Sequence, residues 1–118
     1  MNFFLHLSTC NTCKKIIKEL NLPNDLNIID IKKTPITLAQ IEKLHKKKGT
    51  YKSLINNRAQ LFKQLNIDIK KLTEEKAKQL LSDHYTFLKR PVLLYKGKAF
   101  VGNSKEEIES AKRWINEQ

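Results

Sequence analysis

The 118-residue sequence has few of the residues that break or crosslink a chain: three glycines, three prolines and two cysteines. So little Gly and Pro excludes a collagen-like or low-complexity chain, and 40% hydrophobic residues favour a folded globule. Two cysteines do not supply the disulfide framework of small secreted domains. The length suits one core, so we expect a single domain over residues 1–118.

Long apolar runs are also missing. The apolar segment over residues 3–7 is shorter than the core of a signal peptide and follows no basic segment. No run approaches the length of a transmembrane helix. We therefore expect a cytoplasmic protein without membrane contact, in which paired cysteines are more often catalytic or redox-sensing than structural.

Acidic residues are scarce relative to basic ones. Twenty-three Lys and Arg against 12 Asp and Glu give a formal net charge of +11, and only three of the cations are arginines. This excess favours anionic partners in general, although biased codon usage would produce the same Lys-, Asn- and Ile-rich composition. No helix-turn-helix or other groove-reading element is visible, so we expect no direct nucleic-acid binding.

The two cysteines lie three residues apart in the segment Ser8-Thr9-Cys10-Asn11-Thr12-Cys13-Lys14-Lys15. Residues 3–7 before it are typical of a short buried strand, and residues 16–20 after it of the apolar face of a helix. Cys10 is therefore expected at a helix N-terminus, with Cys13 in the first turn. The unpaired N–H groups, the helix dipole and the nearby lysines should lower the pKa of the Cys10 thiol below its free value of about 8.5.

A thiol that is ionised near neutral pH is a nucleophile, and a second thiol three residues away can resolve the adduct that forms. We therefore interpret Cys10 and Cys13 as a redox-active pair. Inert core cysteines, half of a zinc site and a permanent disulfide are the alternatives. Polar neighbours argue against the first, and the small enclosed loop argues against the third. Because His6, His45 and His84 lack ligand spacing, we expect no metal site.

The segments that follow indicate an α/β chain with a helical insertion. A second strand is predicted over residues 26–31, and strand, helix and strand of these lengths form a parallel βαβ unit. Residues 34–88, approximately, show only helical periodicity. Within them, Thr37-Leu38-Ala39-Gln40 is a capping box and Gly49 a helix stop.

The last third of the chain predicts a hairpin and a helix. Residues 92–95 and 99–101 read as antiparallel strands around the turn Lys96-Gly97-Lys98. A second capping box, Ser104-Lys105-Glu106-Glu107, opens the terminal helix. The order β-α-β, helices, β-β-α fits one four-stranded mixed sheet, which is the thioredoxin-like arrangement with Cys-x-x-Cys at the first helix N-terminus.

Four segments carry a resemblance to a known family: Cys10-Asn11-Thr12-Cys13-Lys14-Lys15, Ile55-Asn56-Asn57-Arg58-Ala59-Gln60-Leu61-Phe62-Lys63-Gln64-Leu65, Leu88-Lys89-Arg90-Pro91-Val92-Leu93 and Phe100-Val101-Gly102. In this order and spacing they make the chain resemble the arsenate reductase-like (ArsC/Spx) branch of the thioredoxin-fold superfamily over essentially its whole length. The resemblance implies that Cys10 is the nucleophile. It also implies that Arg58 and Arg90 bind an oxyanion, and that Pro91 is cis and faces the cysteine loop.

Two departures from the reductase pattern matter. Residues 96–103 contain no third arginine, and Lys98 could supply charge there but not a planar fork. The second cysteine, Cys13, is typical of Spx-type regulators, whose cysteine pair is a disulfide switch and which bind the RNA polymerase α subunit.

The resemblance therefore leaves three functions open. One is a reductase-like enzyme that acts on a small oxyanion or thiol substrate, with no bound cofactor and an external thiol donor (glutathione with glutaredoxin, or thioredoxin). The second is a redox-sensing regulator that binds the polymerase. The third is a family member with another thiol substrate.

Overall fold

Four short strands form a mixed sheet in the computed structural model, which describes all residues from 1 to 118. The strands are β1 (Phe3–His6), β2 (Asn27–Asp30), β3 (Val92–Tyr95) and β4 (Lys98–Val101), and their order in the sheet is β2-β1-β3-β4. β1 pairs with β2 in parallel and with β3 in antiparallel orientation, and β3 pairs with β4 in antiparallel orientation. These pairings confirm the predicted four-stranded mixed sheet and the thioredoxin-like α/β class.

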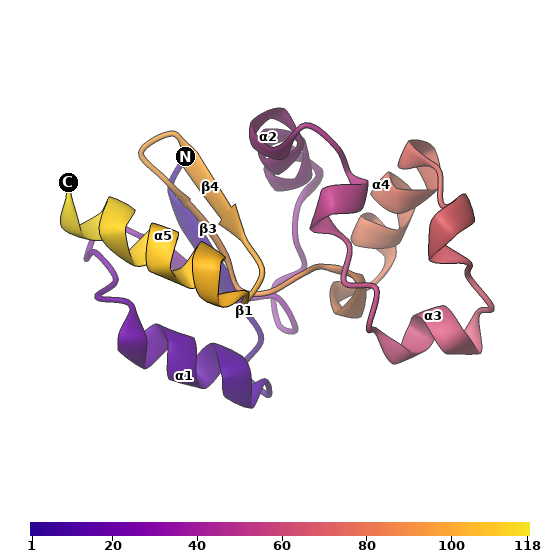
Figure 1. The fold of residues 1–118 in the computed structure, drawn as a ribbon, viewed down its shortest axis with the longest axis horizontal. Helices are drawn as coiled ribbons and strands as arrows, with labels where there is room; N and C mark the ends of the chain where they lie inside the picture. The colour runs from indigo at the N-terminus through magenta and orange to yellow at the C-terminus, as the bar shows by residue number, and fades with distance from the viewer. The chain divides into compact units, whose positions relative to one another are not determined.

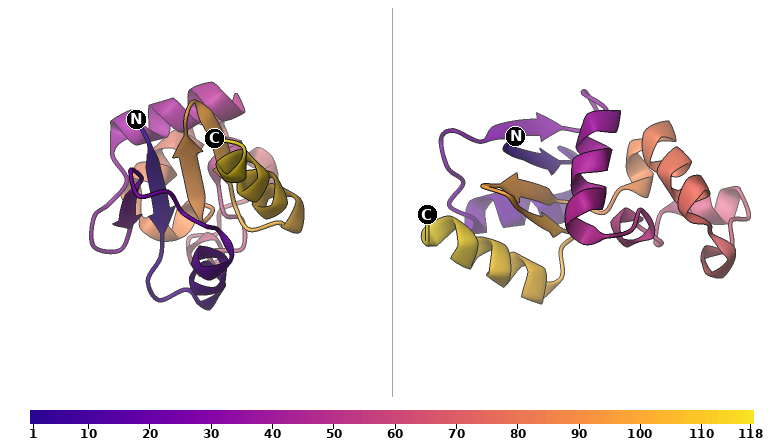
Figure 2. Two further views of the ribbon diagram at one scale, coloured as in Figure 1. Left: turned by 90° about the vertical axis from the view of Figure 1, so that its left-hand side faces the viewer. Right: turned by 90° about the horizontal axis from the view of Figure 1, so that it is seen from above.

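The chain divides into two units (Figures 1 and 2). The first comprises Met1–Thr34 and Arg90–Gln118 and contains the sheet, and the second comprises Pro35–Lys89. The second unit corresponds to the helical insertion expected at about residues 34–88. That residues 1–118 form a single domain stays a prediction.

Two helices of the first unit, α1 (Asn11–Glu19) and α5 (Lys105–Asn116), cover one face of the sheet. The core between them and the strands is almost entirely apolar: Phe4, Ile16, Leu20, Leu26, Leu93, Tyr95, Phe100, Ile108, Ala111 and Ile115. Burial of this apolar surface is the main term that stabilises the unit. The same packing holds the N-terminus of α1 near the C-terminal end of β1.

The hairpin turn is one residue shorter than the sequence suggests. Lys96 (φ 47°) and Gly97 (φ 83°) both adopt left-handed backbone conformations, as a two-residue type I′ turn requires. Lys98 therefore belongs to β4, where it pairs with Tyr95.

The predicted capping box at the start of α5 forms only in half. The Ser104 hydroxyl accepts the Glu107 N–H at 3.2 Å, as expected of an N-cap. The Glu107 carboxylate, however, accepts the Val101 N–H of β4 at 2.8 Å. The prediction of a reciprocal box was wrong here because the edge strand offers Glu107 a donor outside the helix.

The second unit is helical, as predicted. Its elements are α2 (Leu38–Lys48), α3 (Gln60–Gln64) and α4 (Glu74–Asp83), with short 3₁₀ helices η1 (Lys52–Leu54), η2 (Ile69–Lys71) and η3 (Tyr85–Phe87). The capping box of Thr37 and Gln40 is complete, and Gly49 ends α2 in a left-handed conformation (φ 90°). The β-structure in this unit is an isolated bridge between Ile55 and Leu88.

A carboxylate at the start of α4 holds the start of η1. Glu74 accepts the Tyr51 N–H at 2.7 Å and the Lys52 N–H at 3.0 Å. We expect Glu74→Ala to reduce the free energy of unfolding by about 1–3 kcal/mol, because both N–H groups lose a charged acceptor. Urea denaturation measures the change.

Glu75→Ala is the matched control for this prediction. Glu75 is exposed in the same first turn of α4, so its removal has the same effect on the helix dipole but breaks no such contact. Equal losses of stability in the two variants would show that the Glu74 contacts do not stabilise the unit.

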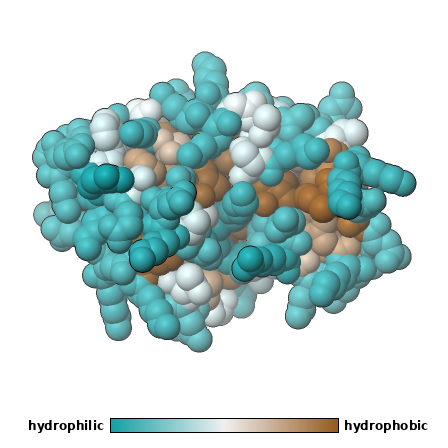
Figure 3. All heavy atoms as spheres, in the orientation of Figure 1, coloured by the Kyte–Doolittle hydropathy of each residue, from teal (hydrophilic) through white to brown (hydrophobic).

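Hydrophilic side chains cover most of the face of the molecule that Figure 3 shows. This agrees with a chain in which 30% of the residues are charged. None of the helices combines the length and the apolar character that crossing a membrane requires.

Candidate functional site

The Cys10 sulfur lies where the first strand of the sheet leads into α1. After β1 the chain turns, and the Cys10 N–H closes this turn on the Leu7 carbonyl at 3.0 Å. Cys10 is the residue directly before α1, in an extended conformation, and its own carbonyl accepts the Lys14 N–H at 3.1 Å. Cys13 lies in the first turn of the helix. The predicted positions of both cysteines are confirmed, and both are free thiols.

Several donors converge on the Cys10 sulfur, which is half-buried. Partial burial raises the pKa of the thiol, but the Cys13 N–H, the Cys13 thiol and the Arg90 guanidinium together hold that pKa below its usual value. The Cys13 N–H acts as a nearby dipole, since no side-chain capping hydrogen bond of ordinary geometry forms at Cys10. The cation beside the sulfur is thus Arg90, from a distant part of the sequence.

Cys13 has the opposite character. Its side chain is fully buried, and this burial, with the negative charge of Cys10, raises the pKa of the Cys13 thiol to about 11 despite a backbone hydrogen bond from Leu7. The pair is therefore asymmetric: Cys10 ionises readily and can be reached, whereas Cys13 keeps its proton.

This asymmetry predicts selective alkylation. At pH 7 we expect iodoacetamide to modify Cys10 and to leave Cys13 of the folded protein unmodified, because the thiolate is the reactive form. As pH rises, the rate at Cys10 should increase through its lowered pKa and then level off, while Cys13 reacts only in strongly alkaline solution. Tandem mass spectrometry of the peptide that holds both residues locates the label. Equal labelling at pH 7 would contradict the asymmetry.

Arg90 and Pro91 precede β3 at the same end of the sheet. The pairing of Leu5 with Val92 places them beside the end of β1, and the Arg90–Pro91 peptide bond is cis, as the resemblance implies. The Nε and Nη1 atoms of Arg90 are buried and have no hydrogen-bond partner in the protein. Buried donors without acceptors are costly, and a guanidinium is suited to oxygen-rich anions. The oxyanion-binding role expected of Arg90 stays a prediction.

Arg58 belongs to the second unit. It is exposed in the turn before α3, and its backbone N–H donates to the Asn56 side chain at 3.2 Å. The structure brings Cys10, Cys13 and Arg90 together within the first unit. The oxyanion-binding role expected of Arg58 stays a prediction.

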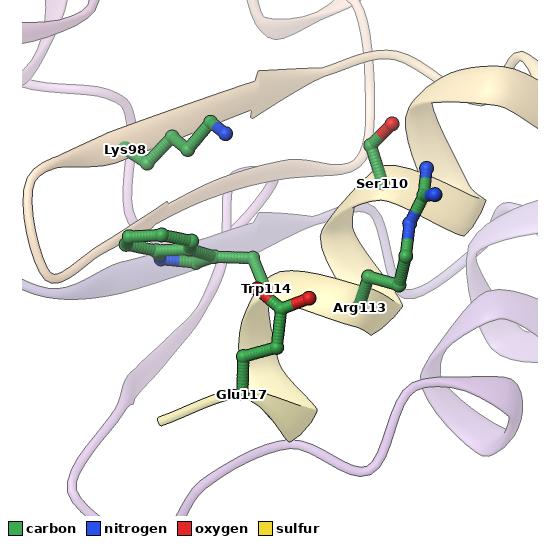
Figure 4. A pocket seen from close by; sticks show the side chains of 5 residues that line it. All are labelled: Lys98, Ser110, Arg113, Trp114 and Glu117. Carbon is green, nitrogen blue, oxygen red and sulfur yellow. The ribbon is translucent and has the colours of Figure 1, made fainter.

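Lys98 does not substitute for the missing third arginine. Val101 is the residue of β4 that pairs with Val92, so Lys98 lies three residues further along the strand, about 10 Å away from that end. Its ammonium is 5.0 Å from the centre of the Trp114 ring, in a shallow hollow of about 230 Å³ (Figure 4). The other residues that line this hollow come from α5 and its C-cap: Ser110, Arg113 and Glu117.

Asp30, the last residue of β2, was not among the site residues predicted from the sequence. In the structure its carboxylate accepts the Ser8 N–H at 3.2 Å, within the loop that presents Cys10. The predicted parallel pairing could have indicated this contact, because the carboxyl ends of two neighbouring parallel strands lie at the same edge of a sheet. No group of three or more His, Cys, Asp or Glu side chains is placed to hold a metal ion.

Comparisons with known proteins agree with this fold. The model of the ArsC family matches residues 5–111. An arsenate reductase from Neisseria meningitidis serogroup A is 30% identical over 79 residues, which are 65% of this chain and 68% of that protein. The global transcriptional regulator Spx 1 of Bacillus cereus is 24% identical over 106 residues, which are 85% of this chain and 78% of that protein.

Solved structures show the same similarity. The crystal structure of an ArsC family related protein from Bacteroides fragilis is 26% identical and covers 94% of this chain and 97% of its own, with a TM-score of 0.76. The family model and the structural match both extend over most of the sequence. The chain therefore belongs to the ArsC family.

Proposed function

We propose that this protein is a thiol-based oxidoreductase of the arsenate reductase-like type, with Cys10 as its nucleophile. The observation that carries the proposal is the position of Arg90 at the end of the sheet that holds Cys10, with its guanidinium Nε and Nη1 buried and without a hydrogen-bond partner in the protein. Arg90 also helps to hold the pKa of the Cys10 thiol below its usual value. A cation in this position favours the thiolate and offers hydrogen bonds to an anion at the point of attack. Membership of the ArsC family supports the same assignment.

With arsenate as substrate, the reaction begins with attack of the Cys10 thiolate on arsenic. A sulfur–arsenic bond forms and an arsenate oxygen leaves as water, while Arg90 holds the remaining oxygens. A second thiol then attacks the Cys10 sulfur. The new disulfide forms as the sulfur–arsenic bond breaks, and its electron pair stays on arsenic, which leaves as arsenite.

The second thiol comes from outside the protein in this proposal. Cys13 is fully buried and its pKa is raised to about 11, so it supplies little thiolate at neutral pH. Glutathione with glutaredoxin, or thioredoxin, would provide an accessible thiol. Cys13 would resolve an adduct on Cys10 only where the first turn of α1 opens.

The test is a reductase assay with arsenate that compares the glutathione and glutaredoxin system with thioredoxin. We expect turnover with one of the two donors, and we expect Cys13→Ser to keep that turnover. No turnover with either donor would reject arsenate as the substrate.

A second candidate is an Spx-like regulator that binds the RNA polymerase α subunit. The Cys-x-x-Cys pair and the 106-residue similarity to Spx 1 favour it. We expect the α subunit to co-purify with the protein in one redox state of the cysteine pair, and its absence from both states would reject the regulator. Either function would place the protein in the cytoplasm, where thiols are kept reduced.

A further inference from the structure

A carboxylate on the neighbouring strand reaches the loop that presents Cys10. Asp30 ends β2 opposite His6 in the parallel register, and the Ile31 N–H donates to the His6 carbonyl at 2.9 Å. From this fixed position, one oxygen of the Asp30 side chain accepts the N–H groups of Ser8 and Lys32, both at 3.2 Å. The carboxylate thus joins the end of β2 to the loop after β1.

The carboxylate is charged in this position. The Ser8 hydroxyl, then the N–H groups of Ser8 and Lys32 and the nearby His6, hold the pKa of the Asp30 carboxyl below its usual range, although desolvation opposes them. Its second oxygen, Oδ2, is covered and has no hydrogen-bond partner in the protein. An ionised acceptor makes the stronger, charge-assisted kind of hydrogen bond to a backbone N–H.

The loop that Asp30 reaches leads directly to Cys10. Residues 7–10 form a tight turn, closed by the hydrogen bond of the Cys10 N–H to the Leu7 carbonyl. This turn decides where the Cys10 sulfur lies relative to the Cys13 N–H and the Arg90 guanidinium. Because both groups act over short distances, a small displacement of the turn would weaken their effect on the thiol.

We propose that Asp30 is a positioning residue of the Cys10 site, which anchors the turn of residues 7–10 and so keeps the sulfur against Cys13 and Arg90. The proposal rests on the proposed role of Cys10 as nucleophile. Asp30 touches no reacting atom. The direction in which the pKa of the Cys10 thiol changes on loss of Asp30 distinguishes two roles. A negative charge near a thiol disfavours the thiolate, whereas an anchor that aligns the thiol with its donors favours the thiolate.

The experiment measures the pH dependence of Cys10 alkylation by iodoacetamide in Asp30→Ala and Asp30→Asn. For Asp30→Ala we expect the rate at pH 7 to fall roughly threefold or more and the midpoint to move to higher pH, with the limiting alkaline rate unchanged. Asp30→Asn keeps an acceptor of the same shape, so it should restore part of the loss. Faster hydrogen exchange of the Ser8 amide should accompany the shift in Asp30→Ala.

The outcomes separate the anchor from a charge effect. A midpoint that stays in place, or moves to lower pH in both variants, would overturn the proposal. Glu19→Ala is the control, because it removes an exposed acid from the other end of α1 and should leave the profile unchanged. Should Asp30→Ala fail to fold, a smaller upward shift in Asp30→Asn still supports the anchor, and no shift rejects it. The assay contains neither arsenate nor a thiol donor, so its result is independent of the reductase assay.

Discussion

Replacement of Cys10 by serine should abolish thiol-dependent turnover, with a loss of roughly a thousandfold or more. A serine hydroxyl in the same place is not ionised at neutral pH, and Arg90 cannot compensate for the missing thiolate. The reductase assay measures the loss, and intact mass after iodoacetamide treatment shows that the reactive group has gone. A Cys10→Ser variant with full activity would rule out the mechanism.

Cys13→Ser is the matched control for this experiment. It removes a thiol from the same helix turn, and with it the side-chain contact to Cys10, but it keeps the Cys13 backbone N–H that also lowers the pKa of the Cys10 thiol. With an external thiol donor we expect activity within about tenfold of the native protein. A loss as large as that of Cys10→Ser would instead identify Cys13 as the obligatory resolving thiol.

Replacement of Arg90 by alanine should have the second largest effect. The pKa of the Cys10 thiol should rise, because the guanidinium hydrogen bond and charge that help to lower it are removed. An oxyanion substrate should also lose the two unpaired Arg90 donors as binding partners. Hydrogen bonds to charged groups contribute about 1.5–3 kcal/mol, so we expect kcat/KM for arsenate at pH 7 to fall roughly 10- to 100-fold.

Two measurements separate the roles of Arg90. The pH profile of alkylation reports the thiol, whereas KM for arsenate reports the anion. Arg90→Lys keeps the charge without the planar fork. It should therefore preserve the pH profile of alkylation better than it preserves KM for arsenate. Arg113→Ala, which removes an exposed arginine that lines the hollow of Figure 4, should change neither. Normal values of both in Arg90→Ala would exclude Arg90 from the site.

Local patterns predicted the framework of the site well. A buried run, a polar Cys-x-x-Cys segment and an apolar helix face are sufficient to place Cys10 before the helix and Cys13 in its first turn. Thr37 and Gly49 mark their helix ends because capping depends on residues close together in the sequence. The four strands, the parallel pair and the antiparallel hairpin were predicted from the same kind of pattern, whereas the pairing of β1 with β3 was not.

Contacts between segments that are distant in the sequence were harder to predict. The sequence alone gave Arg90 no link to Cys10, and the resemblance to the family supplied it. Asp30 was missed because its contact with Ser8 depends on the register of β2 against β1. Lys98 was considered as a source of charge because it lies in the segment that lacks a third arginine. The two-residue turn instead places Lys98 at the end of β4 that is far from Val92.

The half-formed capping box affects how readily copies of this chain can pair through the edge strand β4. β4 is an outer strand of the sheet, and the Val101 N–H points away from β3 toward Glu107. Unpaired N–H groups on such strands are what a second polypeptide uses to extend a sheet from molecule to molecule. With that donor already engaged, Glu107 removes one of the N–H groups through which a second chain could pair with this edge.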